Sequence, residues 1–101
     1  MKANGIGQRI ELGRFIVADP KICHGQPTYK GTRIMAWQIL EEVERGETWN
    51  EITREWDGRV SHLAIAETIA LSHLIEKDKP FQGFHARARR KSTRQPTAMA
   101  A

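Results

Sequence analysis

The sequence has little that could cross-link it and no run that could anchor it in a membrane. Cys23 is the single cysteine in 101 residues, so no disulfide can form within the chain and a reducing compartment is expected. No apolar run approaches the roughly 18 residues of a membrane span, and residues 1–8 lack the apolar stretch of a signal peptide. These absences predict a cytoplasmic protein that has no membrane partner.

Histidine and cysteine are also too sparse and scattered to form a metal centre or a nucleophilic site. Cys23 and His24 are adjacent in a segment expected to be extended, so their side chains point apart. His62 and His73 are separated by roughly 16 Å along a single predicted helix, too far to share one ion. A cysteine nucleophile also needs a base and an orienting partner, which this loop does not supply. We therefore expect no metal, no cofactor and no enzymatic activity.

What the chain does have is positive charge concentrated at its C-terminus, within a total net charge of +4. Residues 1–76 carry 9 Lys/Arg and 11 Asp/Glu, a net charge of −2, whereas residues 77–101 carry 7 Lys/Arg and only one acid, a net charge of +6. Basic tails bind nucleic acids or acidic protein surfaces. The alternative is a solvated tail that only aids solubility.

The patterning predicts a mainly α fold that begins with short strands. Residues 9–17 favour a strand interrupted at a glycine, and residues 27–29 and 32–34 favour a small hairpin whose turn needs Gly31. Helices are expected over 36–45, 48–56 and 61–77, and the last two form a helix-turn-helix, winged-helix-like unit. This predicts a flexible lead-in at 1–8, a helix-turn-helix domain at 9–77 and a basic, disordered tail at 78–101.

Capping signals mark the predicted helix starts. Thr48 and Glu51 have the spacing of a capping box, and Ser61 has the character of an N-cap residue. The acidic side chains of the first helix and the following turn are interpreted as a solvated face, comprising Glu41, Glu42, Glu44 and Glu47.

The third predicted helix is apolar around most of its circumference. We expect one stripe to pack into the body, made of Ala66, Ile69, Ala70 and His73. A second apolar stripe, made of Ile65, Leu71 and Ile75, would then need to be covered by something else. A second copy of the chain would cover it in a homodimer, while the tail or the N-terminal strands are the alternatives.

The segment between residues 19 and 34 carries a specific motif. It contains an Asp-Pro, a Gly-x-Pro and a Gly-Thr-Arg followed by an apolar residue, and its key positions are Gly25, Pro27, Gly31, Thr32 and Arg33. Gly31 sets the turn, Thr32 is expected to bond the turn backbone, and Arg33 is expected to tie the hairpin to a carboxylate such as Asp19. We favour this stapling role over direct contact with a ligand.

These residues resemble the signature of a bacterial family, domain of unknown function 433, over about residues 9–75. The resemblance implies a helix-turn-helix protein that acts as an antitoxin beside a PIN-like ribonuclease toxin. The turn before the third helix departs from the family pattern, because Trp56-Asp57-Gly58 stands where members have Tyr-Pro.

Two binding modes follow, and each has its own candidate residues. For DNA, the start of the third helix would enter the major groove and use Arg54, Arg59, Ser61 and His62. For the toxin, the tail would present two aromatic anchors followed by cations to the metal-binding carboxylates, and these partner-binding residues are Phe81, Phe84, Arg87, Arg89 and Arg90. A stand-alone transcription regulator without a toxin is the alternative function.

Overall fold

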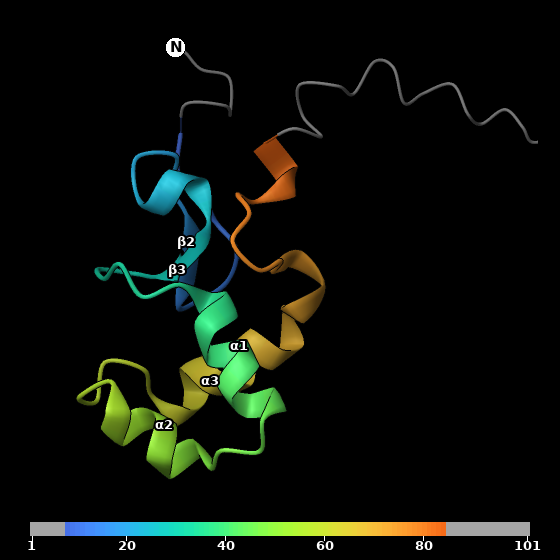
Figure 1. The fold of residues 1–101 in the computed structure, drawn as a ribbon. Coiled ribbons are helices and arrows are strands. Elements are labelled where there is room, and N and C mark those ends of the chain that lie inside the picture. Colours follow the sequence, from blue (N-terminus) through green and yellow to red (C-terminus); the bar gives the residue numbers. More distant parts are fainter. Residues whose placement is uncertain (1–7, 85–101) are drawn as a thin grey trace, which may run out of the picture.

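The computed structural model describes residues 8–84 of the chain, in which a small sheet lies at one end and three helices follow (Figure 1). The strands are β1 (Ile10–Glu11), β2 (Ile16–Ala18) and β3 (Pro27–Tyr29), in the antiparallel order β1-β2-β3. The helices are α1 (Ala36–Glu44), α2 (Trp49–Glu55) and α3 (His62–Ala70), with short 3-10 turns η2 (Cys23–Gly25) and η3 (Ser72–Leu74). The prediction of a mainly α fold with N-terminal strands is confirmed.

The interruption predicted at Gly13 separates β1 from β2. The amides of Leu12 and Gly13 both donate to the carbonyl of Ile16, and this closes the turn between the two strands. All three residues of β2 are buried because this strand is the central one. A short apolar run in a central strand is the expected pattern.

The turn at Gly31 forms as predicted. Gly31 has φ +77°, a left-handed conformation that favours glycine. The Thr32 hydroxyl donates to the Tyr29 carbonyl at 2.8 Å and accepts from the Ile34 amide at 3.0 Å. The predicted contact of Thr32 with the turn backbone is therefore confirmed.

Two details of this hairpin differ from expectation. Residues 32–34 form no strand. The strand β3 pairs along its length with β2, and its pairing with the chain after the turn is limited to the isolated bridge between Thr28 and Met35 and a few hydrogen bonds of Tyr29. Arg33 is exposed and forms no ion pair within residues 8–84, so the predicted tie to Asp19 is wrong. The Asp19 carboxylate accepts instead from the Lys21 amide two residues later.

The capping signals are confirmed for both later helices. Thr48 Oγ1 accepts from the Glu51 amide at 3.1 Å, while the Glu51 carboxylate accepts from the Thr48 amide at 3.0 Å. Ser61 Oγ accepts from the Ala64 amide at 3.1 Å. Each cap satisfies an amide that the first helical turn leaves without a partner.

The prediction for the inward face of α3 is wrong. The buried residues are Ala64, Ile65 and Thr68, whereas the stripe expected to pack inward is exposed, namely Ala66, Ile69, Ala70 and His73. The polar residue Thr68 turns this face of the helix inward. It is fully buried, its hydroxyl donates to the Ala64 carbonyl, and it shares a 2.7 Å hydrogen bond with the Tyr29 hydroxyl.

The length of α3 also differs from expectation. It ends at Ala70 instead of continuing to residue 77, and after η3 the chain leaves in an extended conformation at Ile75. Leu71 and Ile75 therefore reach the body from outside the helix. None of the helices within residues 8–84 has the length and apolar character that crossing a membrane requires.

The core lies between the sheet and the three helices. Its fully buried large side chains come from every layer: Ile16, Ile39, Ile52, Val60 and Ile65. Burial of each such aliphatic side chain contributes about 1.5–3 kcal/mol relative to exposure. This core fixes the relative positions of α1, α2 and α3, which carry the surfaces described next.

Candidate functional site

The residues predicted to contact DNA lie on the unit formed by α2, the turn and α3. Arg54, Arg59 and His62 are exposed, and His62 stacks edge to face with Trp49 at a ring-centroid distance of 5.9 Å. Ser61 is exposed, but its hydroxyl is engaged as the N-cap of α3. Of the three exposed side chains, Arg54 lies in the last turn of α2, Arg59 in the turn and His62 at the start of α3, and only the two arginines are permanently charged.

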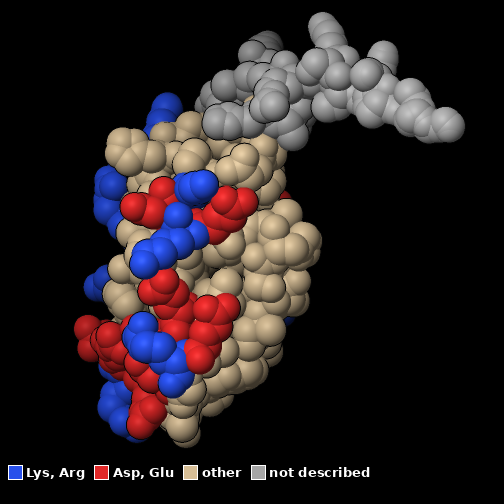
Figure 2. All heavy atoms as spheres, turned by 45° about the vertical axis from the view of Figure 1, so that its right-hand side comes forward, with Lys and Arg blue, Asp and Glu red and all other residues tan. Residues whose placement is uncertain are grey.

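Exposed apolar side chains also occur on α2 and α3. Leu63 is 62 % exposed, Ile69 41 % and Trp49 37 %, the exposed large hydrophobic side chains of the described chain. Figure 2 shows the wider division of the surface, with charged side chains gathered on one side of the view and a broad uncharged surface on the other. We call Trp49, Leu63 and Ile69 the apolar patch. Such a patch is typical of a protein interface.

The Gly-x-Pro motif connects the N-terminal loop to two other parts of the chain. The buried Gln26 accepts a hydrogen bond from the Trp37 indole of α1 at 2.9 Å. The Gly25 carbonyl accepts from the Phe81 amide at 2.8 Å, and a Cβ at Gly25 would lie 3.0 Å from the Phe84 ring. These contacts support the stapling role favoured for the motif.

The predicted partner-binding residues divide into two groups. Phe81 and Phe84 are half-buried, and their rings pack edge to face at 5.6 Å beside Gly25. Packing against the body thus continues past residue 77. The cations Arg87, Arg89 and Arg90 lie outside the described residues, as do the lead-in up to residue 7 and the rest of the tail.

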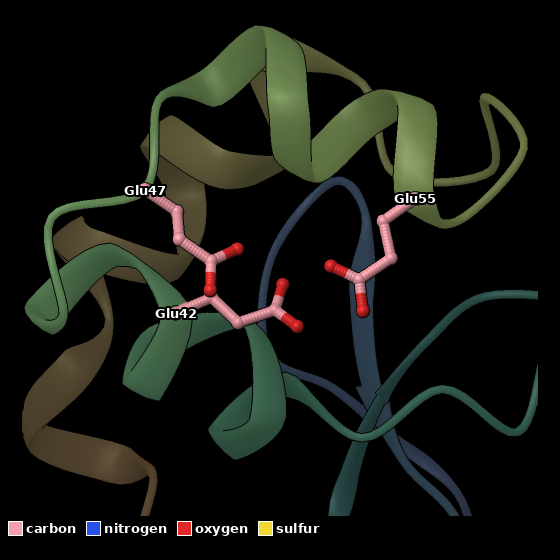
Figure 3. Close-up of side chains that lie close together, drawn as sticks. All are labelled: Glu42, Glu47 and Glu55. Carbon is pink, nitrogen blue, oxygen red and sulfur yellow. The ribbon is translucent and has the colours of Figure 1, made fainter.

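The acidic residues of α1 are not simply a solvated face, because Glu42 is only 6 % exposed. Its carboxylate accepts from the Trp56 indole at 3.2 Å. Carboxylate oxygens of Glu42, Glu47 and Glu55 lie within 4.8 Å of one another, with Glu47 in the loop after α1 and Glu55 at the end of α2 (Figure 3). The spacing of acids along the sequence gave no signal for this cluster, since the indole donor and Glu55 come from the next helix.

The cluster borders a pocket of about 340 Å³, which we call the Trp37–Trp56 pocket. Its lining combines two indole rings with charged and polar side chains: Trp37, Gln38, Glu41, Glu42, Arg45, Glu55 and Trp56. Burial raises the pKa of the Glu42 carboxyl, the Trp56 hydrogen bond opposes this rise, and the nearby Glu55 and Glu47 add to it. Carboxylates and aromatic faces together are suited to binding a cation.

Three carboxylates at this spacing are also the ligand type that hard divalent ions prefer. Two of them already have partners, because Glu47 pairs with Arg45 at 3.0 Å and Glu42 accepts from Trp56. The cluster by itself therefore gives no reason to revise the expectation that the protein uses no metal.

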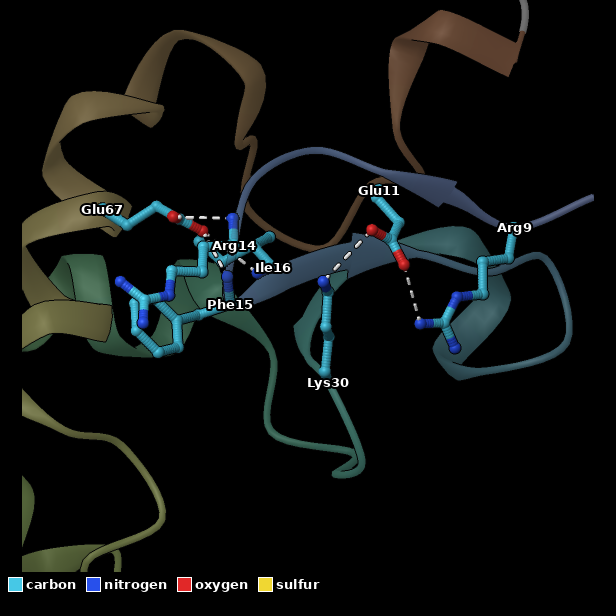
Figure 4. A network of polar contacts seen from close by, with 7 residues as sticks. All are labelled: Arg9, Glu11, Arg14, Phe15, Ile16, Lys30 and Glu67. Atoms are coloured by element: carbon cyan, nitrogen blue, oxygen red, sulfur yellow. Dashed lines mark hydrogen bonds and ion pairs between the residues drawn. The ribbon is translucent and has the colours of Figure 1, made fainter.

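A second carboxylate that the sequence did not reveal joins the sheet to α3. Glu67 accepts hydrogen bonds from the backbone amides of Arg14, Phe15 and Ile16 at 2.9, 2.9 and 3.1 Å (Figure 4). A single helix residue thereby satisfies three donors of the β1–β2 turn, more than fifty positions away in the chain. Its role is to position the sheet.

Comparison with known proteins returns one family. A family model described as "Protein of unknown function (DUF433)" matches residues 16–70, which include β2, the Gly-x-Pro and Gly-Thr-Arg motifs and all three helices. The comparisons find no match among curated proteins or among solved structures.

Proposed function

Because the chain belongs to the DUF433 family of proteins of unknown function, we propose that it acts by binding a protein partner in the bacterial cytoplasm. It is the antitoxin of a type II toxin–antitoxin pair, and its partner is a PIN-like ribonuclease toxin. The observation that carries this proposal is the separation of charge along the chain. All twelve Asp and Glu residues lie within residues 8–84, whereas residues 85–101 contain five Lys and Arg and no acid.

The C-terminal segment supplies the inhibitory contact in this mechanism. Arg87, Arg89 and Arg90 reach the carboxylates that hold the toxin's metal, and guanidinium groups pair with carboxylates through two parallel hydrogen bonds. Phe81 and Phe84 hold the base of this segment at Gly25, so the cations leave the body from a fixed point. The partly exposed edges of the two rings add apolar contact with the toxin.

The test is co-expression with an adjacent PIN-like gene, followed by affinity purification and a ribonuclease assay. Replacing Arg87, Arg89 and Arg90 with Gln is expected to weaken toxin binding at least about 100-fold, because each lost charge-assisted hydrogen bond contributes about 1.5 kcal/mol or more. The far-ultraviolet circular dichroism spectrum of the variant is expected to match that of the wild type, which would show that the body stays folded.

A matched control removes three cations from the body. Lys21, Arg33 and Arg59 are exposed and form no ion pair within residues 8–84. Replacing them with Gln is expected to leave toxin binding unchanged. Equal loss of binding in both triple variants would show that total charge, and not the C-terminal segment, drives association, and would contradict the proposed mechanism.

Operator DNA is the second candidate partner, and the exposed Arg54 on α2, Arg59 in the turn and His62 at the start of α3 favour it. Binding of this kind weakens steeply with salt, because phosphate contacts release counterions. Arg54→Gln together with Arg59→Gln is expected to abolish retardation of the operator fragment while toxin neutralisation persists. DNA binding that does not depend on salt would argue against this role. If the chain binds operator DNA but no toxin, the result would support the stand-alone regulator.

Self-association is the third element of the proposal. The apolar patch on α2 and α3 lies on the surface, and a second copy that covers it would bury the side chains of Trp49, Leu63 and Ile69. Because Trp49 stacks on His62, such a dimer would cover part of the surface offered to DNA, so self-association through this patch and operator binding are alternatives in this proposal.

A further inference from the structure

The Trp37–Trp56 pocket has more negative charge than the described chain neutralises. Four carboxylates line or border it, and two of them have cationic partners: Glu47 pairs with Arg45 at 3.0 Å, and Glu41 pairs with Lys77 at 3.3 Å. No basic side chain within residues 8–84 forms an ion pair with Glu42 or Glu55. Two carboxylates of the pocket, including its most buried acidic residue, Glu42, are therefore left without a cationic partner in this part of the chain.

Besides the lining residue Arg45, a second cation of the body contacts the pocket wall. The Lys77 ammonium lies 5.5 Å from the centroid of the Trp37 ring while it pairs with Glu41. Indole is the aromatic ring that attracts cations most strongly. A second indole, that of Trp56, lines the same pocket. It lies beside Glu42 and Glu55, the two carboxylates that have no cationic partner within residues 8–84. The contact of Lys77 thus places a cation against the Trp37 wall of the pocket.

A guanidinium group suits the Trp56 side of the pocket. Its planar donors can bond Glu42 and Glu55 at the same time, and its face can stack on the Trp56 ring. The two carboxylates destabilise each other when both are ionised, and a bound cation removes this repulsion. Glu42 and Glu55 reach the pocket from α1 and α2, so one bound arginine would also join the two helices.

We propose that the Trp37–Trp56 pocket binds an arginine side chain from the chain's own C-terminal segment, residues 85–101. This segment carries five cations and no acid, which makes it complementary to the pocket. The inference does not depend on whether the same segment also binds a toxin. If it does, toxin and pocket compete for the same arginines.

The length of the chain permits this contact within one molecule. Lys77 lies at the pocket and Phe84 is seven residues later, so an extended chain places Phe84 at most about 25 Å from Lys77. Arg94 is ten residues beyond Phe84 and can reach about 35 Å. Gln26, which bonds Trp37, directly follows Gly25, where Phe84 packs. The segment therefore begins near the Trp37 side of the pocket.

The test uses the indole N–H signals of the three tryptophans in the full chain, measured by NMR with ¹⁵N labelling at low salt. The variant replaces Arg87, Arg89, Arg90 and Arg94 with Gln. The indole signals of Trp37 and Trp56 are expected to shift relative to the wild type, whereas the signal of Trp49, outside the pocket, stays in place. The unchanged Trp49 signal also shows that the variant is folded.

A double-mutant comparison assigns the shift to the pocket. In a Glu55→Gln background, the four-arginine change is expected to shift Trp37 and Trp56 by less than half as much, because one of the two unpaired carboxylates is gone. Glu44→Gln is the matched control, because Glu44 lies on α1 outside the pocket and its substitution removes the same negative charge. In that background the full shift is expected.

Three results would overturn the inference. The first is no movement of Trp37 and Trp56 in the four-arginine variant. The second is a shift of the same size in the Glu55→Gln and Glu44→Gln backgrounds, which would reflect net charge alone. The third is a shift that appears only as protein concentration rises from about 20 to 500 μM, which would assign the pocket to the segment of a second copy.

Discussion

At the scale of single residues, two buried or half-buried carboxylates have opposite effects on the fold. Glu67 satisfies three backbone amides, while Glu42 is 6 % exposed, has one indole donor and lies beside other acids. The first stabilises the fold by completing hydrogen bonds. The second costs free energy when it ionises. Both roles depend on partners that are distant in sequence.

Replacing Glu67 with Ala is expected to lower the free energy of unfolding by about 2–3 kcal/mol, because the amides of residues 14–16 lose a charged acceptor. Urea denaturation followed by circular dichroism measures this change. Glu76→Ala is the control, since Glu76 is exposed and its pair with Lys79 at 3.8 Å contributes at most about 0.5 kcal/mol. Equal effects of the two substitutions would contradict the role of Glu67.

The raised pKa of Glu42 makes stability depend on pH with a definite sign. Burial is the main cause of the rise above the ordinary value of 4.5. The folded state therefore holds this proton more tightly than the unfolded state, and stability falls as pH rises from 4.5 through the raised pKa. Glu42→Gln, which keeps an acceptor for Trp56, is expected to remove this fall and to raise the melting temperature at pH 7 but not at pH 4.

Thermal unfolding at about 0.5 M NaCl is the appropriate measurement, because salt screens any contact between the C-terminal segment and the pocket. Glu44→Gln, an exposed change on the same helix, serves as the control and is expected to leave the pH dependence unaltered. A melting temperature for Glu42→Gln that tracks the wild type at every pH would contradict the argument.

At the scale of elements, the features that were predictable from sequence are local. The caps at Thr48 and Ser61 each span only four consecutive positions, and the turn at Gly31 needs only a short motif. The inward face of α3 was not predictable in this way. Thr68 is buried because its hydroxyl hydrogen-bonds the Tyr29 hydroxyl, and Tyr29 lies 39 positions earlier in the chain. The positions of apolar residues along α3 therefore indicated the wrong inward face.

The candidate site follows the same division between local and distant contacts. The roles of Gly31 and Thr32 were predictable because they are local, whereas Gly25 meets Phe81 and Phe84 from the far end of the described chain. The Trp37–Trp56 pocket was not, because it needs α1 and α2 to pack at a particular angle before Glu42 and Glu55 become neighbours. The position of β3 beside β2 was missed for the same reason.

The N-cap of α3 gives a prediction at this scale. Ser61→Ala is expected to lower the free energy of unfolding by about 1 kcal/mol, and Ser61→Gly by only a few tenths. Thermal denaturation of both variants measures the difference. Because the Ser61 hydroxyl is engaged with the Ala64 amide, neither change is expected to weaken operator binding once the protein is folded. A specific loss of DNA affinity in Ser61→Gly would assign the hydroxyl to the DNA instead.

At the scale of the whole molecule, apolar and charged surfaces are segregated. The apolar patch lies on α2 and α3, and the acidic pocket lies between α1 and α2. A chain with this division can associate with a second copy through one surface and still bind a cationic segment through the other. The two associations respond differently to salt, because only the second depends on charge.

The apolar patch predicts the oligomeric state. Leu63→Lys combined with Ile69→Lys is expected to convert a dimer to a monomer at about 100 μM, because each buried lysine would lack a partner. Light scattering coupled to size-exclusion chromatography measures the mass. Glu44→Lys, an exposed change on α1, is expected to leave the dimer intact. A wild-type chain that is monomeric at this concentration would refute self-association through α3.

The anchoring of the β1–β2 turn by Glu67 has a consequence for how the molecule opens. The amides of Phe15 and Ile16 are protected by a side chain from α3, so they cannot exchange with deuterium while that helix stays docked. Their protection factors should match those of the α3 interior and exceed what a three-residue strand would retain by itself. The short sheet would then be released only when the helical layer comes apart.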